Sequence, residues 1–422
     1  MPLPQLQVLV VGGGAAGFFG AIACAEAYPN AQVVLLEAGQ QILSKVRISG
    51  GGRCNVTHAC FEPALLIQHY PRGGKALRGS FSRFQPRNTI EWFAKRGVTL
   101  KTEADGRMFP ITDSSETIVD CLIRAAKNAG VLIRTGIPVA TVTKSDNQQL
   151  GSKFELNLKS GEVLKGDRLL LATGSNPQGY RLAKSLGHTI EPPVPSLFTL
   201  MVPEPALKEL AGVAVEQAQA QLLVPHAKPL TQAGPVLITH WGLSGPAILK
   251  LSAWGARLLH DCQYQATLRL NWLPSQTLEQ IRQALLATKI EQGKRTIAAA
   301  SPFPLPRRLW QYLVQRAGAT EGDRWATLSK STLNRLAQEL SQGEYPIQGK
   351  GVFKEEFVTC GGINLKEVDF KTMESRICPG LYFAGEILDI DGITGGFNFQ
   401  SAWTTGWLAG QAMGKLSATR EL

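Results

Sequence analysis

The segment QVLVVGGGAAG at residues 7–17 decides the fold. Its apolar run, residues 7–11, is typical of a strand buried in a parallel sheet. A glycine-rich turn follows, then an Ala- and Phe-rich helix expected over residues 17–28 and a second apolar strand over residues 31–37. A strand, a helix and a strand in this order form a βαβ unit, which predicts an α/β fold with a parallel sheet and right-handed crossovers.

The glycine spacing predicts a dinucleotide site at the first turn. Gly12 allows the tight turn, Gly14 allows the backbone to approach a pyrophosphate, and Gly17 allows the helix to pack against the strand. The helix N-terminus would face the phosphates, and Glu37, 20 residues after Gly17, would accept hydrogen bonds from a ribose. The residues predicted to line this part of the site are Gly12, Gly14, Ala15, Ala16, Gly17, Glu37 and Ala38.

A second glycine-rich segment, KVRISGGGRCNVT at residues 45–57, is also expected at the cofactor. Three consecutive glycines leave backbone amides bare, and cationic and amide side chains add donors, so the segment suits close approach to a flavin or its phosphates. The alternative is a flexible surface loop. The predicted contacts are Lys45, Ser49, Gly51, Gly52, Arg53, Cys54 and Asn55.

Two segments near the end of the chain complete the expected site, GLYFAGE at residues 380–386 and GGFNFQ at residues 395–400. The first ends a strand at a glycine, where backbone can meet a ligand. The second opens the last helix, whose N-terminal dipole would stabilise negative charge on a reduced flavin ring. LLATG at residues 170–174 is another strand expected to end at the cofactor. The predicted contacts are Val139, Ala172, Thr173, Gly174, Gly385, Glu386, Gly395, Gly396, Phe397 and Asn398.

Four motifs in order resemble the BaiN/RdsA family of NAD(P)/FAD-dependent oxidoreductases. They are SGGGRCNVTH at residues 49–58, GRMFP at 106–110, THWGLSGPAIL at 239–249 and GEILDIDGITGGFNFQ at 385–400. The resemblance runs along nearly the whole chain. It implies a discontinuous Rossmann-like FAD-binding domain with an inserted β-barrel and a small helical insert. It also implies FAD as cofactor, with NAD(P)H as the transient reductant.

Composition shifts at a Pro-rich step, residues 191–195, which marks a domain boundary. We expect the first part of the FAD-binding domain at residues 1–194. The inserted β-barrel and helical region, on the substrate side, is expected at residues 195–345. The second part of the FAD-binding domain is then expected at residues 346–422.

The net charge of +11 is concentrated in one stretch. Residues 68–101 hold eight Lys or Arg against one acid, Glu91, so +7 lies there and +4 in the rest of the chain. Basic residues interleaved with aromatics suit phosphate contacts and base stacking, as in RNA binding. The alternative is a solvated basic face with its aromatics turned to the core. The predicted RNA contacts are Arg72, Lys75, Arg78, Arg83 and Arg87, and the interleaved aromatics are Tyr70, Phe81, Phe84, Trp92 and Phe93.

Composition excludes several classes of protein. No window approaches the roughly 18 apolar residues of a membrane span, so we expect no membrane partner. The N-terminus is typical of a first strand and not of a signal peptide. The seven cysteines are odd in number and contain no C-x-x-C pair, so neither a disulfide framework nor a metal site is expected. These features predict a cytoplasmic protein.

Members of the family that the chain resembles reduce carbon–carbon double bonds, either in ribosomal RNA uridine or in steroid-type enones. The C5=C6 bond of uracil is conjugated to C4=O, so uracil is itself an enone. Reduction of either substrate therefore needs hydride at the β-carbon and a proton at the α-carbon. The clustered charge favours an rRNA dihydrouridine synthase. A small-molecule ene reductase remains an alternative, as does a non-catalytic RNA- or ribosome-binding protein that keeps FAD for stability.

Cys54 and His240 are the candidate proton donors. Arg53 beside Cys54 could lower the pKa of its thiol. The alternative for Cys54 is packing beneath FAD. His240 could protonate substrate near the flavin or could be a structural histidine.

Overall fold

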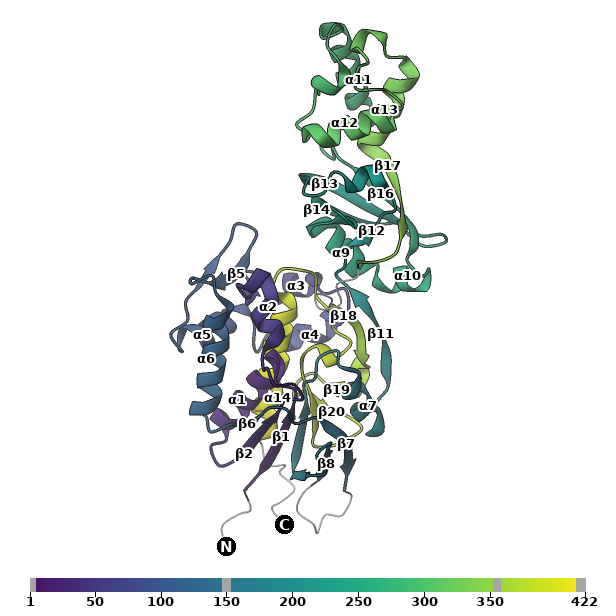
Figure 1. Ribbon diagram of the computed structural model, residues 1–422. Helices are drawn as coiled ribbons and strands as arrows, with labels where there is room; N and C mark the ends of the chain where they lie inside the picture. The colour runs from purple at the N-terminus through teal and green to yellow at the C-terminus, as the bar shows by residue number, and fades with distance from the viewer. Residues whose placement is uncertain (1–4, 146–152, 352–357, 415–422) are drawn as a thin grey trace. The chain divides into compact units, whose positions relative to one another are not determined.

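The computed structural model describes residues 5–145, 153–351 and 358–414. The chain divides into two compact units (Figure 1). Unit 1 comprises Met1–Pro193 and Thr359–Leu422, and unit 2 comprises Val194–Val358. Unit 1 is therefore assembled from both ends of the chain.

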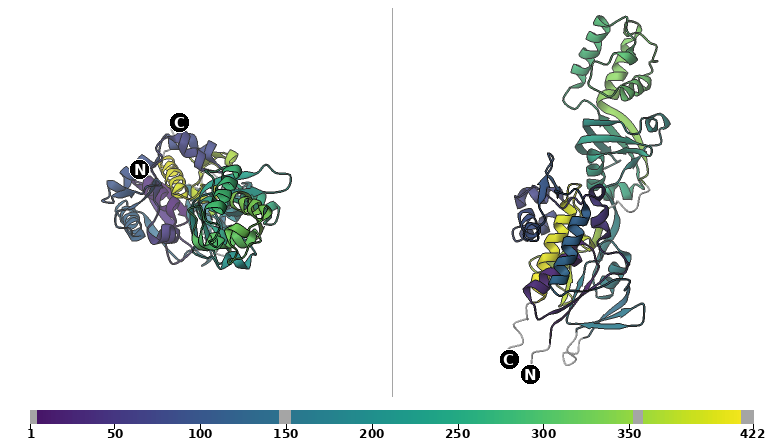
Figure 2. Two further views of the ribbon diagram at one scale, coloured as in Figure 1. Left: turned by 90° about the horizontal axis from the view of Figure 1, so that it is seen from above. Right: turned by 60° about the vertical axis from the view of Figure 1, so that its left-hand side comes forward.

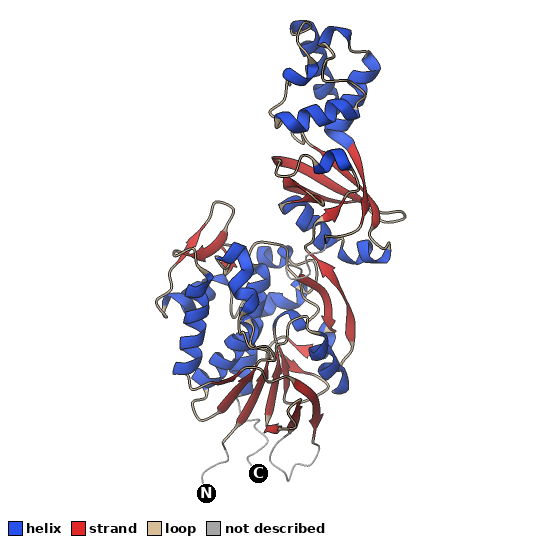
Figure 3. Cartoon of the chain, viewed as in Figure 1, coloured by secondary structure: helices blue, strands red, loops and turns tan. Residues whose placement is uncertain are grey.

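Unit 1 is built on a mixed sheet, with its strands side by side in Figure 3. In spatial order the strands are β19 (Val368–Asp369), β20 (Glu374–Ser375), β21 (Leu381–Phe383), β10 (Arg168–Leu171), β1 (Gln7–Val11), β2 (Gln32–Leu36) and β6 (Leu132–Arg134). From β21 to β6 the pairing is parallel, and β19 and β20 add an antiparallel edge. The predicted α/β, Rossmann-like fold is confirmed.

Two helices that begin at opposite ends of the chain pack along each other; the later one is the long yellow helix in the right-hand view of Figure 2. They are α1 (Ala15–Ala27) and α14 (Phe397–Met413). A Cβ atom added at Gly406 would lie 2.6 Å from the Ala16 carbonyl oxygen, and one at Gly410 would lie 2.5 Å from the Gly20 carbonyl oxygen. The two helix backbones are therefore close enough that only glycine fits at these positions.

Smaller elements surround this core of unit 1. Its further strands are β3 (Thr57–His58), β4 (Leu100–Thr102), β5 (Arg107–Pro110), β7 (Val139–Lys144), β8 (Phe154–Leu158) and β9 (Val163–Gly166), with β11 (Ile190–Ser196) paired to β18 (Val358–Ile363). Its further helices are α2 (Ser44–Gly52), α3 (Pro63–Leu66), α4 (Gly74–Phe81), α5 (Pro86–Ala94), α6 (Ser115–Asn128) and α7 (Pro177–Ser185).

Unit 2 contains an antiparallel sheet and a group of helices. In spatial order the strands are β12 (Leu200–Met201), β15 (Gly242–Ser244), β14 (Leu230–Thr239), β13 (Ala214–Leu223), β16 (Gln265–Asn271) and β17 (Gly343–Gln348). The helices are α8 (Pro205–Lys208), α9 (Pro246–Trp254), α10 (Ala256–Asp261), α11 (Leu278–Glu291), α12 (Arg307–Arg316) and α13 (Lys330–Gln342). They share one apolar core with the sheet.

The expected β-barrel in unit 2 is not confirmed, because the strand ladder is an open sheet with β12 and β17 at its edges. The segment after β17 links these edges. The Met201 amide donates to the Gly349 carbonyl (3.0 Å), and the Gly351 amide donates to the Thr199 carbonyl (2.9 Å). The second boundary between the units also differs from the expected one. Because β17 pairs with β16, it belongs to unit 2, and the boundary lies at residue 358 and not at residue 345.

Three further features of the described residues concern helix length, possible metal ligands and cysteines. No helix among them is long and apolar enough to cross a membrane. No group of three or more His, Cys, Asp or Glu side chains among them could hold a metal ion. All seven cysteines are free thiols.

The contact between α1 and α14 predicts the effect of enlarging one glycine. Gly406→Ala places a methyl group against the Ala16 carbonyl and should lower the free energy of unfolding by about 1–3 kcal/mol, as overpacking does. Gly79→Ala is the matched control, since a Cβ there meets nothing within 4 Å. Urea denaturation of both variants measures the difference. Equal stability of Gly406→Ala and wild type would contradict this account of the contact.

Candidate functional site

The first glycine turn contains two kinds of glycine, which differ in whether protein backbone lies against them. A Cβ atom added at Gly12, where φ is +114°, would lie 2.3 Å from the Ala172 carbonyl oxygen, and one at Gly17 would lie 1.9 Å from the Gly12 carbonyl oxygen. Both glycines are therefore required by the protein's own backbone. Gly14 differs, because a Cβ there meets nothing within 4 Å. It forms the N-cap of α1, whose first turn holds no acidic residue, so open space adjoins a helix N-terminus.

Glu37 follows β2 and lies beside this turn. One carboxylate oxygen, Oε2, accepts a hydrogen bond from the Gly13 amide (2.7 Å), and Oε1 accepts one from the Gly39 amide (2.8 Å). The carboxylate thus fixes the backbone of the glycine turn after β1 and of the loop after β2. Ala38, in the loop after β2, is exposed.

The second glycine segment is not a regular helix, although it lies within the bounds of α2. Its backbone leaves helical geometry from Ser49, and Gly50, Gly51 and Gly52 have φ values of +58°, +68° and +81°. A Cβ at Gly51 or Gly52 would meet nothing within 4 Å. Cys54 follows at φ +61°, an uncommon conformation for a residue with a side chain. The segment therefore presents bare backbone to open space, like Gly14.

Contacts across the sequence bring the predicted segments together. Lys45 forms an ion pair with Glu386 (2.5 Å), whose second oxygen accepts a hydrogen bond from the Thr359 amide (3.0 Å). The side-chain oxygen of Asn55 accepts from the Gly396 amide (3.0 Å) once its amide is oriented to satisfy both neighbours. The glycine segment thus lies against both C-terminal motifs.

The end of β10 lies beside the same carboxylate. A Cβ at Gly174, where φ is +59°, would lie 3.6 Å from Oε2 of Glu386. The hydroxyl groups of Thr173 and Tyr180 are buried without a hydrogen-bond partner among the described residues. Burial, and secondarily the negative charge of Glu386, raise the pKa of Tyr180, so its hydroxyl stays protonated. Buried polar groups normally have hydrogen-bond partners, so these two hydroxyls are open to a partner that the protein does not supply.

The C-terminal motifs supply the last part of the site. Gly385, at φ +76°, approaches Ala16, because a Cβ there would lie 2.7 Å from the Ala16 Cβ. The ring of Phe397, at the start of α14, stacks on His58 (4.7 Å between ring centroids) and His69 (4.3 Å). We call the segments 12–17, 49–57, 172–174 and 385–397, with Lys45 and Tyr180, the four-segment site.

Other predicted contacts have partners within the protein. Ser49 donates to the Val46 carbonyl (3.0 Å), and the Val139 carbonyl accepts from the Gln178 amide (3.1 Å). The Asn398 side chain bonds the Gly392 backbone at both of its polar atoms (2.8 Å each). These residues shape loops of unit 1 by bonding backbone.

Arg53 lies over the Phe109 ring (4.0 Å to its centroid) and pairs with Glu103 (2.7 Å) and Asp113 (3.6 Å). Its charge is thus taken up within the protein.

The two candidate proton donors lie in different units. The thiol of Cys54 is fully buried in unit 1, and burial raises its pKa to about 12. The direction of the pKa shift is opposite to the one expected from the neighbouring Arg53, because desolvation of the thiol outweighs the lowering effect of its hydrogen bond with Ser49. His240 is exposed in unit 2, in the turn between β14 and β15.

The basic stretch separates into a structural part and an exposed part. Arg72 pairs with Asp391, which is completely buried, so this guanidinium holds unit 1 together. The aromatics Tyr70, Phe81, Phe84 and Phe93 are buried in the core, as the second alternative expects. Trp92 is partly buried, packs on Phe19 and has the Arg96 guanidinium over its ring. The cations Lys75, Arg78, Arg83 and Arg87 are exposed.

Sequence reasoning missed Tyr180 in the four-segment site, and also His58 and His69, which stack on its residue Phe397. Tyr180 lies in α7 and reaches the site through the fold alone, so no local pattern marks it. His58 closes the motif SGGGRCNVTH and could have been considered as a titratable group there. His69 lies in a separate short helix, and only the structure places it beside Phe397.

Comparisons with known proteins agree with this architecture. Residues 6–412 match the family model described as HI0933-like protein Rossmann domain. A 3-dehydro-bile acid delta(4,6)-reductase of Clostridium scindens is 30% identical over 96% of this chain and 98% of its own. A ribosomal RNA dihydrouridine synthase of Escherichia coli is also 30% identical, over 97% of this chain and 98% of its own.

Solved structures share the fold at low identity. The 3-ketosteroid-delta4-(5alpha)-dehydrogenase of Rhodococcus jostii RHA1 has a TM-score of 0.52 at 16% identity, covering 99% of this chain and 98% of its own. With a family model that matches nearly its whole length, this chain belongs to the HI0933-like Rossmann family of oxidoreductases.

Proposed function

We propose that the chain is a FAD-dependent, NAD(P)H-driven reductase of a conjugated carbon–carbon double bond, acting on a uridine of ribosomal RNA. The cofactor part rests on one contrast between glycines. Gly12 and Gly17 are required by neighbouring backbone, whereas Gly14, Gly51 and Gly52 face open space. Open glycine backbone beside the N-terminus of α1 suits a phosphate-bearing ligand that approaches the backbone closely.

The residues of the four-segment site fit FAD. The helix N-terminus at Gly14 would bind the pyrophosphate, and the buried hydroxyls of Thr173 and Tyr180, with Glu386, would bond sugar or ribityl hydroxyls. The N-terminus of α14 at Phe397 would favour negative charge on a reduced ring. When bound, FAD supplies hydride chemistry that no amino-acid side chain offers.

The RNA substrate is supported by exposed charge and by one relative. Lys75, Arg78, Arg83 and Arg87 remain exposed on and after α4, where they can contact phosphates. The Escherichia coli relative carries the name ribosomal RNA dihydrouridine synthase, and it matches nearly the full length of both chains. Both features suit an enzyme that holds a polyanionic substrate.

A small-molecule enone reductase is the second candidate. The Clostridium scindens relative, named as a bile acid reductase, is as similar to this chain as the Escherichia coli relative is. Both reactions add hydride and a proton across a double bond conjugated to a carbonyl. The same four-segment site therefore serves either substrate, and the choice lies in residues that hold the rest of the molecule.

One experiment separates the two candidates. The purified holoenzyme is supplied with NADH or NADPH and with either unmodified ribosomal RNA or a steroid that carries a conjugated enone. We expect dihydrouridine to form in the RNA, measured by mass spectrometry of nucleosides, with little turnover of the steroid. Turnover of the steroid alone would establish the second candidate, and turnover of neither would overturn the proposal.

The burial of Cys54 predicts the behaviour of its serine variant. A fully buried thiol offers no accessible surface to a substrate, so we expect Cys54→Ser to leave turnover nearly unchanged. Loss of a true proton donor would instead slow substrate reduction by about 10²–10⁴-fold while flavin reduction by NAD(P)H stays intact. Single-turnover rates of the two half-reactions distinguish these outcomes. A selective fall in substrate reduction would assign the proton to Cys54.

A further inference from the structure

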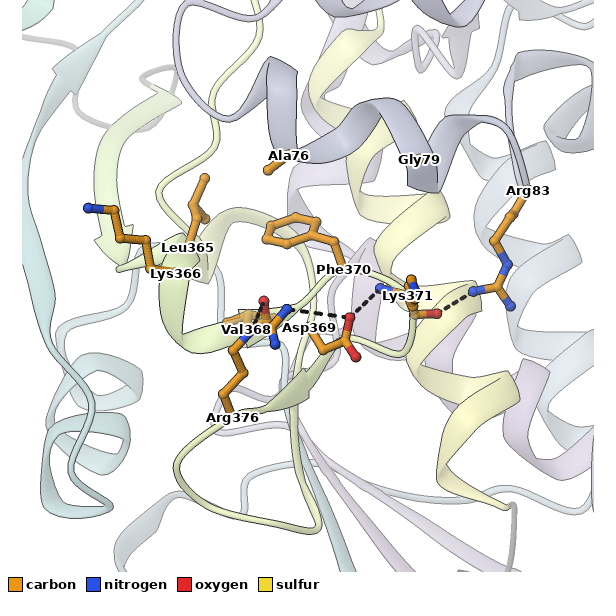
Figure 4. Close-up of a pocket in the computed structure, with 10 residues that line it drawn as sticks. All are labelled: Ala76, Gly79, Arg83, Leu365, Lys366, Val368, Asp369, Phe370, Lys371 and Arg376. Atoms are coloured by element: carbon orange, nitrogen blue, oxygen red, sulfur yellow. Dashed lines mark hydrogen bonds and ion pairs between the residues drawn. The ribbon is translucent and has the colours of Figure 1, made fainter.

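Unit 1 contains a cavity that shares no residue with the four-segment site. Its volume is about 970 Å³. Figure 4 shows the residues that line it. One wall is formed by α4 and the residue Arg83 that follows it, and the other by residues 365–376, which include β19 and β20. These two segments are almost 300 residues apart in sequence, so neither predicts the cavity alone.

The lining of the cavity is strongly basic. Four cations, Arg83, Lys366, Lys371 and Arg376, contribute to it against one acid, Asp369. Asp369 is already engaged, because its Oδ1 accepts from the Lys371 amide (3.0 Å) and lies 3.7 Å from Arg376. No carboxylate of the described residues lies within ion-pair distance of the Lys366 or Lys371 ammonium group. The cavity therefore carries uncompensated positive charge.

An apolar surface accompanies these charges. Phe370 is only half-buried, and its ring lies between α4 and the segment that carries Leu365 (Figure 4). At Gly79, on the α4 side, a Cβ would meet nothing within 4 Å, so the wall leaves room beside the ring. A partly exposed aromatic ring among cations is the arrangement that binds single-stranded nucleic acid, with bases on the ring and phosphates on the cations.

The cavity also continues a larger basic surface. Arg83 belongs both to its lining and to the exposed cations of the basic stretch, which include Lys75 and Arg78 on α4. A small anion would need one pair of cations, whereas exposed cations on α4 and after it, together with those of the cavity, suit a chain of phosphates.

We propose that this cavity binds a nucleotide of single-stranded RNA. The nucleotide belongs to the same strand as the uridine that is reduced at the four-segment site. In the cavity, Lys366 and Lys371, with Arg83, contact the backbone phosphates and Phe370 stacks on a base. The inference rests on the proposed RNA substrate. The cavity would be a second binding site for that RNA, outside the four-segment site. Binding at this second site would keep the RNA strand attached while one uridine is reduced.

Two variants of the holoenzyme test the proposal, Lys366→Glu combined with Lys371→Glu, and Phe370→Ala. The matched control is Lys228→Glu combined with Lys294→Glu, the same charge change at exposed lysines of unit 2. Binding of a fluorescein-labelled single-stranded RNA oligonucleotide is measured by anisotropy over a range of salt concentrations. FAD content and NAD(P)H-driven reduction of a dye are measured in parallel.

We expect the cavity lysine variant to bind RNA far more weakly at low salt. Its logarithmic salt slope should be smaller than that of wild type by about 0.7 for each phosphate that the two lysines neutralise. Phe370→Ala should weaken binding about tenfold, the size of one base stack. The control should bind like wild type, and FAD content and dye reduction should not change in any variant.

Two other outcomes overturn the inference in distinguishable ways. If wild type binds RNA and forms dihydrouridine but both cavity variants bind RNA equally well, the cavity is not on the RNA path and the proposed function stands. If wild type itself shows no salt-dependent RNA binding and no dihydrouridine, the RNA substrate and the cavity proposal fail together.

Discussion

The close approach of backbone to backbone at the first glycine turn is the constraint on which unit 1 depends. Gly12 lies against the end of β10, and Gly17 lies against Gly12, so β1, β10 and α1 meet with no side chain between them. Gly406 and Gly410 repeat this closeness between α1 and α14. As a result, segments from both ends of the chain converge on one place, where Gly14 and the second glycine segment leave space unfilled.

The parts of the site that follow from local backbone requirements could be predicted from the sequence. The roles of Gly12 and Gly17 depend on a turn only a few residues long, so the spacing of the glycines was sufficient to predict them. The strand and helix of the βαβ unit follow from short apolar runs for the same reason. The pairing of Lys45 with Glu386 was not itself predictable, but both residues were recognised as members of motifs at the cofactor.

The rest could not be predicted, because burial and long-range pairing decide it. Arg72 stands in a basic stretch that is typical of a nucleic-acid surface, yet it neutralises the buried Asp391. The aromatics of that stretch alternate with cations because one face of each short helix enters the core. Tyr180 and the lining of the cavity depend on segments far apart in sequence. The periodicity of apolar residues identifies which face of a helix is apolar. It does not identify which charged residue, far away in the sequence, lies beside a given cation.

The central claim is that the space at Gly14 is occupied by the pyrophosphate of FAD. The direct measurement is the FAD content of purified wild type and of Gly14→Asp, together with the thermal stability of both proteins after FAD removal. We predict about one FAD per wild-type chain, almost none in Gly14→Asp, and similar stability of the two apoproteins, because a Cβ at Gly14 meets no protein atom. Gly14→Asp protein that retains FAD at the wild-type level would contradict the account.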